Sequence, residues 1–329
     1  MSEDDIEPAL ADALRGLPDD FKNFDRVFAE KLRPELQKME VLRQKAAPRA
    51  KQGYIRGGVL GVVGALAGML LFSQPILAGL SVIAGIGIAA YMSSDLRKLG
   101  GQAKSFMVTP IAREFGLEYL EAPGVQPSIR DFRAAGLLPG WDREGFEDKL
   151  TGERDGVPFE FFEAHLEDKR TRTDSKGRAR TEWVTVFRGQ CLRFGFHKTF
   201  YGRTLVARDA GLFNRFGGGS GMNIAKLEDP VFEKIFSVYT TDQVESRFLL
   251  TPDLMQRFVD LEETFRGGSI RCCFVGGEIL IVIANGDMFE PGSLFTPLDN
   301  PERIRELLDD FAAVFHLIDA TSEQRGRKG

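Results

Sequence analysis

The stretch from Gly57 to Met92 reads GGVLGVVGALAGMLLFSQPILAGLSVIAGIGIAAYM and contains no charged residue. A single helix of this length would extend about 54 Å, well beyond a hydrocarbon layer of about 30 Å. Pro75 disfavours a helical conformation at the residue before it and suits the first turn of a new helix. The stretch therefore predicts a transmembrane hairpin of two helices, 57–72 and 75–92. A helical hairpin buried in a soluble core is the alternative.

Basic residues flank this hairpin on both sides, whereas the turn at 73–75 carries no charge. No acidic residue lies between Glu40 and Asp95. Loops rich in Lys and Arg stay in the cytoplasm, so we predict that both termini are cytoplasmic. The flanking basic residues are Arg43, Lys45, Arg49, Lys51 and Arg56 before the hairpin, and Arg97, Lys98 and Lys104 after it.

Small residues recur at three- and four-residue spacing within both predicted helices, which lets helices approach closely. Two interpretations are open: these faces pack the two helices of the hairpin together, or they form a contact between copies of the chain. Neither helix contains an ionisable residue, which disfavours an ion pathway or a proton relay. The residues concerned are Gly57, Gly61, Gly64 and Gly68 in the first helix, and Ser81, Gly85 and Ala89 in the second.

The remaining sequence divides into segments of different composition. We predict a flexible acidic tail at 1–18, amphipathic cytoplasmic helices at 19–52, the hairpin within 53–93, a cytoplasmic α+β domain at 94–320 and a basic tail at 321–329. Charged residues make up 28% of the chain, which is typical of a folded, soluble domain. The net charge of −5 disfavours nucleic acid as a partner.

The predicted domain contains strands and helices in separate blocks, which favours an α+β fold with an antiparallel meander. Strands are expected on either side of Asp155–Gly156 and of Gly276–Gly277. The strand in 203–210 is expected to continue the meander after 181–196. Helices are expected to begin near Thr251, as a cap, and at Pro301.

The chain resembles an uncharacterised bacterial membrane family, catalogued as domain of unknown function 3137, some members of which carry the automatic label "galanin". The resemblance rests on the predicted hairpin, on FEKIFSVYTTDQVESRFLLTPDLMQRF at 232–258 and on FVGGEILIVIANGDMFEP at 274–291. It extends from about residue 20 to 320 and is most specific at Tyr239–Pro252. It implies a multi-pass protein of the bacterial inner membrane and brings no established activity or site.

The stretch KRTRTDSKGRAR holds six basic residues and one acid, Asp174. It is expected to form the tip of a hairpin, either as a plain solvated turn or as a contact with anionic lipid; RNA and an acidic protein are lesser options. The basic residues are Lys169, Arg170, Arg172, Lys176, Arg178 and Arg180.

No catalytic constellation, metal site or cofactor site is predicted. Asp242 and Glu245 would share one face of a helical turn, where they either cap the helix or form a hidden acid–base or cation site. The favoured hypothesis is an inner-membrane-anchored protein whose cytoplasmic domain binds a partner or ligand. The alternatives are a hydrolase-like membrane enzyme that uses Asp242 and Glu245, and a structural subunit of an oligomeric membrane complex.

Overall fold

The computed structural model describes residue 21 and residues 24–70, 74–173, 179–208, 221–265, 268–290 and 292–321. The predicted acidic tail lies outside this part of the chain, as do residues 322–329 of the basic tail. The chain forms two compact units. The helical unit comprises residues 1–111 and 289–309, and the sheet unit comprises residues 112–288 and 310–329.

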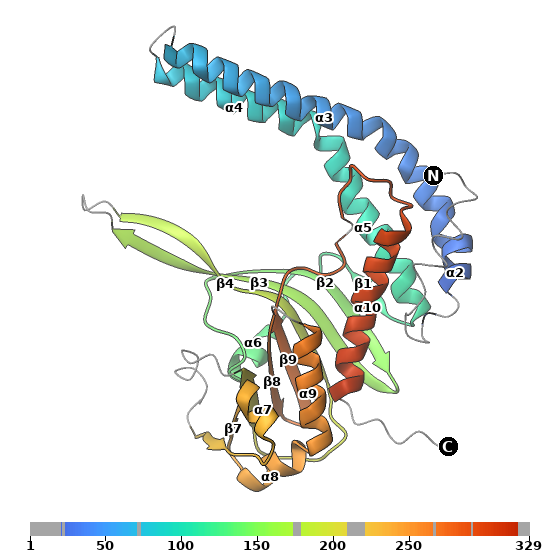
Figure 1. Ribbon diagram of the computed structural model, residues 1–329, viewed down its shortest axis with the longest axis vertical. Coiled ribbons are helices and arrows are strands. Elements are labelled where there is room, and N and C mark those ends of the chain that lie inside the picture. The colour runs from blue at the N-terminus through green and yellow to red at the C-terminus, as the bar shows by residue number, and fades with distance from the viewer. Residues whose placement is uncertain are drawn as a thin grey trace. The chain divides into compact units, whose positions relative to one another are not determined.

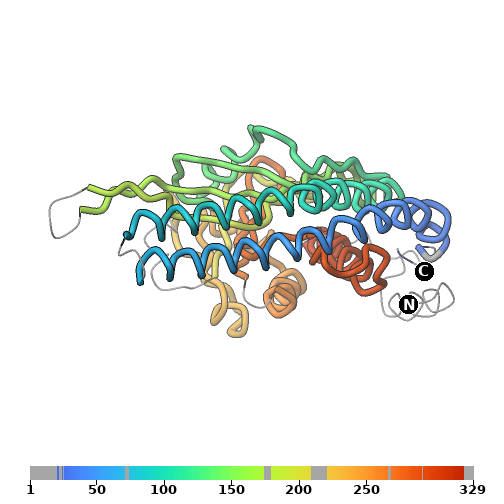
Figure 2. The backbone as a smooth tube through the Cα atoms, turned by 90° about the horizontal axis from the view of Figure 1, so that it is seen from above, coloured from blue at the N-terminus to red at the C-terminus, as the bar shows by residue number. Residues whose placement is uncertain are grey.

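Long helices dominate the helical unit (Figure 1). Two of them, α3 and α4, lie side by side in both views (Figure 2). Contrary to the prediction of separate amphipathic and apolar helices, α3 runs without interruption through both regions. The elements are α2 (Phe24–Val27), a π-helix (Phe28–Leu32), α3 (Arg33–Leu70), α4 (Pro75–Met92), α5 (Ser94–Glu114), which ends in the sheet unit, and the first part of α10 (Pro301–Thr321).

One face of α3 is buried along most of its length. A three-and-four spacing keeps such a stripe on one side of a helix. In its first half the stripe contacts the segment 293–298, and from Gly53 onward it contacts α4. The buried residues are Leu36, Glu40, Arg43, Ala47, Ala50, Gly53, Gly57, Gly61 and Gly68.

The sheet unit contains an antiparallel sheet in the order β1-β2-β3-β4-β9-β8-β5-β7-β6. The predicted α+β class is confirmed. The strands are β1 (Glu118–Leu120), β2 (Arg143–Arg154), β3 (Val157–Thr173), β4 (Ala179–Gly195), β5 (Thr204–Arg208), β6 (Asn223–Ala225), β7 (Phe236–Thr240), β8 (Ser269–Val275) and β9 (Glu278–Ala284). The helices are α6 (Ile129–Ala134), α7 (Pro230–Ile235), α8 (Gln243–Leu249), α9 (Pro252–Thr264) and the last part of α10.

Both predicted turns occur. Asp155 and Gly156 join β2 to β3, and Gly276 and Gly277 join β8 to β9; all four residues have positive φ, as a tight two-residue hairpin requires. One expectation was wrong: β5 does not continue the meander beside β4. Instead β4 pairs with β9, and β5 lies between β8 and β7.

Helices cover both faces of the sheet. On one face, Phe132 of α6 packs edge-on against Phe162 of β3, with 5.8 Å between the ring centroids. On the other face, Phe258 of α9 packs against Phe236 of β7, with 6.1 Å between the ring centroids. Burial on both faces explains why β9 is an unbroken apolar run instead of an alternating one.

Candidate functional site: the helical hairpin, its base and the basic ribbon

Small residues form the seam between α3 and α4. A Cβ added at Gly57 would collide with the carbonyl oxygen of Gly85, and one added at Gly64 would lie 2.5 Å from the Cβ of Ser81. At Gly68 it would lie 2.7 Å from the backbone nitrogen of Ala78. All of the small residues singled out in the sequence, including Gly61 and Ala89, therefore lie at or beside this seam.

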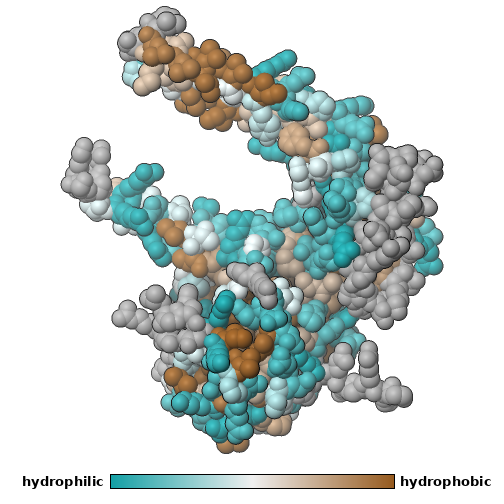
Figure 3. Space-filling view, viewed as in Figure 1, coloured by the Kyte–Doolittle hydropathy of each residue, from teal (hydrophilic) through white to brown (hydrophobic). Residues whose placement is uncertain are grey.

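The outward surface of the hairpin is apolar and exposed. Ile86 is 64% exposed and Val62 is 62% exposed, although both are aliphatic. In Figure 3 strongly hydrophobic residues gather along this hairpin. Within the described part of the chain, two helices are long and apolar enough to cross a membrane: Phe28–Leu70, taken with its π-helical start, and Pro75–Met92.

Replacing Gly57 with leucine is expected to destabilise the hairpin by about 1–3 kcal/mol, because the obstacle is backbone that no rotamer change can move. Spin labels at the exposed positions Ile55 and Tyr91 should report a longer and broader distance. Gly58→Leu is the matched control, since a Cβ there meets nothing within 4 Å. Equal distances in the two variants would contradict this account of the seam.

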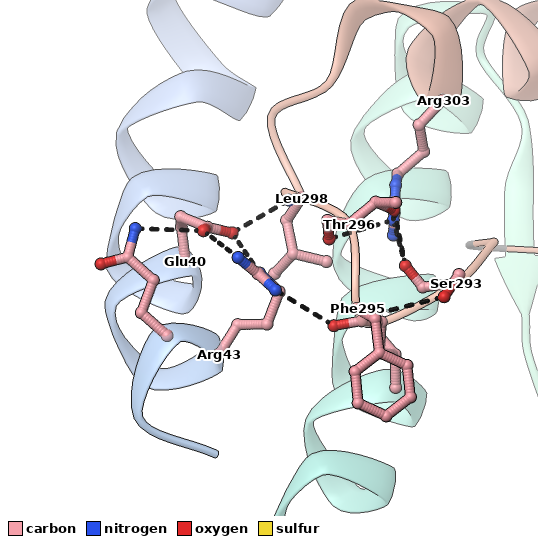
Figure 4. A network of polar contacts seen from close by, with 9 residues as sticks. Glu40, Arg43, Ser293, Phe295, Thr296, Leu298 and Arg303 are labelled. Carbon is pink, nitrogen blue, oxygen red and sulfur yellow. Dashed lines mark hydrogen bonds and ion pairs between the residues drawn. The ribbon is translucent and has the colours of Figure 1, made fainter. Parts of the chain in front are cut away.

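A buried ion pair holds the segment 293–298 against α3 (Figure 4). Arg43 donates from Nε and Nη2 to the two carboxylate oxygens of Glu40, each at 2.7 Å. Glu40 also accepts the Leu298 N–H at 3.0 Å, and Arg43 reaches the Leu294 carbonyl at 3.3 Å. Burial alone would raise the pKa of Glu40, but the hydrogen bonds from Arg43, Leu298 and Gln44 outweigh it and hold the pKa below its usual value.

Arg303, on α10, also binds the segment 293–298 through hydrogen bonds. Its Nη2 donates to the Ser293 carbonyl and to the Thr296 hydroxyl, both at 2.7 Å. Burial and the nearby charge of Arg43 lower the pKa of Arg303. Sequence analysis missed this junction; the available signal was that Glu40 and Arg43 continue the buried stripe that includes Leu36.

The basic stretch lies on a two-stranded ribbon, defined as residues 168–173 of β3 and 179–184 of β4, which extends beyond the rest of the sheet (Figure 1). Arg170 pairs with Asp168 at 3.2 Å, and Arg172 pairs with Glu182 at 2.8 Å. The side chains of Lys169 and Arg180 have no partner among the described residues. Lys176 and Arg178 lie outside the described part of the chain.

Asp242 and Glu245 both bind backbone N–H groups. Asp242 is the N-cap of α8 and accepts the N–H groups of Val244 at 2.8 Å and of Glu245 at 3.0 Å. Glu245 accepts those of Tyr201 and Gly202 at 2.7 and 2.6 Å. These contacts fix the loop before β5, and they occupy the carboxylates with structural hydrogen bonds.

A hollow of about 330 Å³ lies nearby, between α6 and the β8–β9 turn. Arg193 lines the hollow and forms ion pairs with Asp131 at 2.8 Å and with Glu278 at 2.7 Å. Arg203 donates to the Ala134 carbonyl at the end of α6 at 3.1 Å. The hollow therefore presents two arginines and two carboxylates to solvent. Sequence analysis did not single it out, because its residues come from distant segments.

A buried carboxyl group lies within the sheet. Glu163 of β3 accepts the Met288 N–H at 2.6 Å and the Gln190 side-chain amide at 3.3 Å through one oxygen. The other oxygen has no hydrogen bond among the described residues. Burial raises the pKa of Glu163 to about 8, and the charges of Asp148 and Asp287 add to that effect. Nothing in the local sequence indicates this environment.

The structure thus defines an α+β protein with two helices long and apolar enough to cross a membrane. A family model described as "Protein of unknown function (DUF3137)" matches residues 185–321, which confirms the resemblance over that part of the chain. No curated protein sequence matches the chain.

Among solved structures, the mycobacterial trehalose monomycolate transport factor A, TtfA, is 11% identical. The match covers 65% of this chain and 94% of that chain, with a TM-score of 0.31.

Proposed function

We propose that this chain is a membrane-anchored protein of the bacterial inner membrane, in which α3 and α4 form a transmembrane hairpin and the sheet unit binds a partner or ligand in the cytoplasm. The observation that carries the proposal is the exposed apolar surface of the hairpin, exemplified by Ile86 and Val62. A soluble protein rarely leaves so large an apolar surface in water. The basic residues on both sides of the hairpin support cytoplasmic termini.

A topology reporter tests this arrangement. Alkaline phosphatase, which is active only outside the cytoplasm, is expected to be active when inserted at Gln74 and inactive when fused after Gly329. Carbonate washing is expected to leave the full chain in the membrane fraction, because both helices are held by the hydrocarbon layer. Release by carbonate would contradict membrane anchoring, whereas the reverse reporter pattern would contradict only the orientation.

For the ligand, the best-supported location is the hollow that contains Arg193 and Arg203. Four charged side chains of both signs converge there: Asp131 on α6, Arg193 on β4, Glu278 on β9, and Arg203 in the loop before β5. All of these except Asp131 lie within the matched residues 185–321. Such a set suits a small molecule that carries a carboxylate or phosphate and further polar groups. The enzyme alternative has less support, because the carboxylates of Asp242 and Glu245 already accept hydrogen bonds from backbone N–H groups.

For the ribbon we propose a contact with the surface of an anionic membrane, worth about 1 kcal/mol for each basic residue that reaches it. A fluorophore on Thr181→Cys, in the full chain in bilayers, is expected to be quenched by brominated anionic lipid and not by brominated neutral lipid. High salt should weaken the quenching. Changing Arg170, Arg172, Arg178 and Arg180 to glutamate should abolish it; unchanged quenching would make the ribbon a plain solvated turn.

A further inference from the structure

A groove of about 410 Å³ lies between α3 and α5, next to the end of the hairpin. Each helix contributes four residues at positions i, i+3, i+4 and i+7, so one face of each helix forms one wall. Ala46 and the buried Leu99 make an apolar floor. The lining residues are Leu42, Lys45, Ala46 and Arg49 from α3, and Asp95, Lys98, Leu99 and Gln102 from α5.

The groove is positively charged. It contains three cations and one carboxylate, and Asp95 pairs with Arg49 at 3.2 Å. The side-chain ammonium groups of Lys45 and Lys98 make no hydrogen bond or ion pair with any other described residue. Two ammonium groups therefore face a concave surface without a counter-charge from the protein, which is the arrangement that a phosphate oxyanion would complete.

The groove lies near the membrane end of the hairpin, which favours a lipid headgroup as the source of that phosphate. Arg49 precedes the apolar run at Gly57 by about 12 Å along α3. Lys98 lies in the second turn of α5, the helix that follows the end of α4 at Met92. The headgroup layer begins at this boundary, and long basic side chains reach several ångströms toward it. Basic pockets between helices on the cytoplasmic side are typical headgroup sites.

We propose that the α3/α5 groove binds the phosphate of one anionic phospholipid, with Lys45 and Lys98 as its principal ligands and Arg49 as a third, shared with Asp95. The inference rests on the proposed membrane anchoring. It differs from the ribbon contact, because the groove holds one lipid in a concave site, whereas the ribbon would touch a surface diffusely.

The test uses the full chain in bilayer discs that contain equal amounts of phosphatidylglycerol and phosphatidylcholine. After gentle release, native mass spectrometry counts the lipids that stay bound. The wild type is expected to retain one phosphatidylglycerol in preference to phosphatidylcholine. Lys45→Gln with Lys98→Gln should reduce that retention at least about tenfold, because two charge-assisted contacts are lost. Lys45→Arg with Lys98→Arg should restore it.

Two exposed lysines of the sheet unit supply the matched control. Lys226→Gln with Lys234→Gln removes the same charge from side chains outside both the groove and the ribbon and should leave retention unchanged. Equal losses in the two glutamine variants, no loss in the groove variant, or equal retention of phosphatidylcholine would each overturn the proposal. Full displacement by millimolar inorganic phosphate would overturn it in favour of a free-phosphate site. Failure of the wild type to enter the discs would instead overturn membrane anchoring, and the lipid site with it.

Discussion

Replacing Glu40 with alanine is expected to lower the free energy of unfolding of the helical unit by about 3–5 kcal/mol, the usual cost of removing one partner from a buried ion pair. Arg43 would remain buried without its bidentate carboxylate, and the Leu298 N–H would lose its acceptor. The segment 293–298 should then detach from α3. Hydrogen exchange is the direct measurement, and peptides covering residues 293–303 should exchange much faster.

Glu35→Ala is the matched control on the same helix. Its carboxylate pairs with Lys38 at the surface, and exposed pairs contribute at most about 1 kcal/mol. Glu40→Gln should fall between the two, because the amide oxygen still accepts one hydrogen bond while the charge on the carboxylate is lost. If Glu40→Ala and Glu35→Ala exchange alike, the ion pair does not hold the segment.

Local patterns predicted the elements whose determinants are local. Pro75 and the absence of charge marked the helix pair, and the Asp155–Gly156 and Gly276–Gly277 dipeptides marked two hairpins, because each turn requires positive φ. The cap at Thr251 was also readable, since its side chain accepts the Leu254 N–H at 3.3 Å. Each of these features depends on residues a few positions apart.

Features that depend on distant pairing were not predictable in the same way. Nothing in β4 indicates that β9 lies beside it, because a strand buried on both faces accepts any apolar neighbour. The Glu40–Leu298 hydrogen bond joins residues 258 positions apart. Sequence analysis used Arg43 only as one of the basic residues that flank the predicted hairpin, and Glu40 only as the last acidic residue before it. The candidate sites in this chain are mostly of this non-local kind.

Glu163 gives the sheet unit a specific dependence on pH. In the unfolded chain its carboxyl has an ordinary pKa near 4.5, whereas in the folded sheet burial raises the pKa to about 8. Between these values the folded state holds a proton that the unfolded state releases. The stabilising contribution is therefore complete below pH 4.5 and is lost as the pH rises toward 8. Each pH unit in that window costs about 1.4 kcal/mol, so the whole effect is on the order of 3–5 kcal/mol.

Glu163→Gln should remove most of this dependence, because the amide stays neutral and its oxygen can still accept the Met288 N–H. The variant should therefore be more stable than the wild type at pH 8, with the difference shrinking toward pH 5. Trp141 and Trp183, the chain's two tryptophans, both lie in the sheet unit, so their fluorescence during denaturant unfolding follows the relevant transition. Glu153→Gln, on the exposed side of β2, is the control and should track the wild type at every pH. If the free energies of unfolding of Glu163→Gln and the wild type vary in parallel with pH, Glu163 is ionised in the folded sheet. The hydrogen bonds from Met288 and Gln190 would then not account for how its buried carboxylate is stabilised.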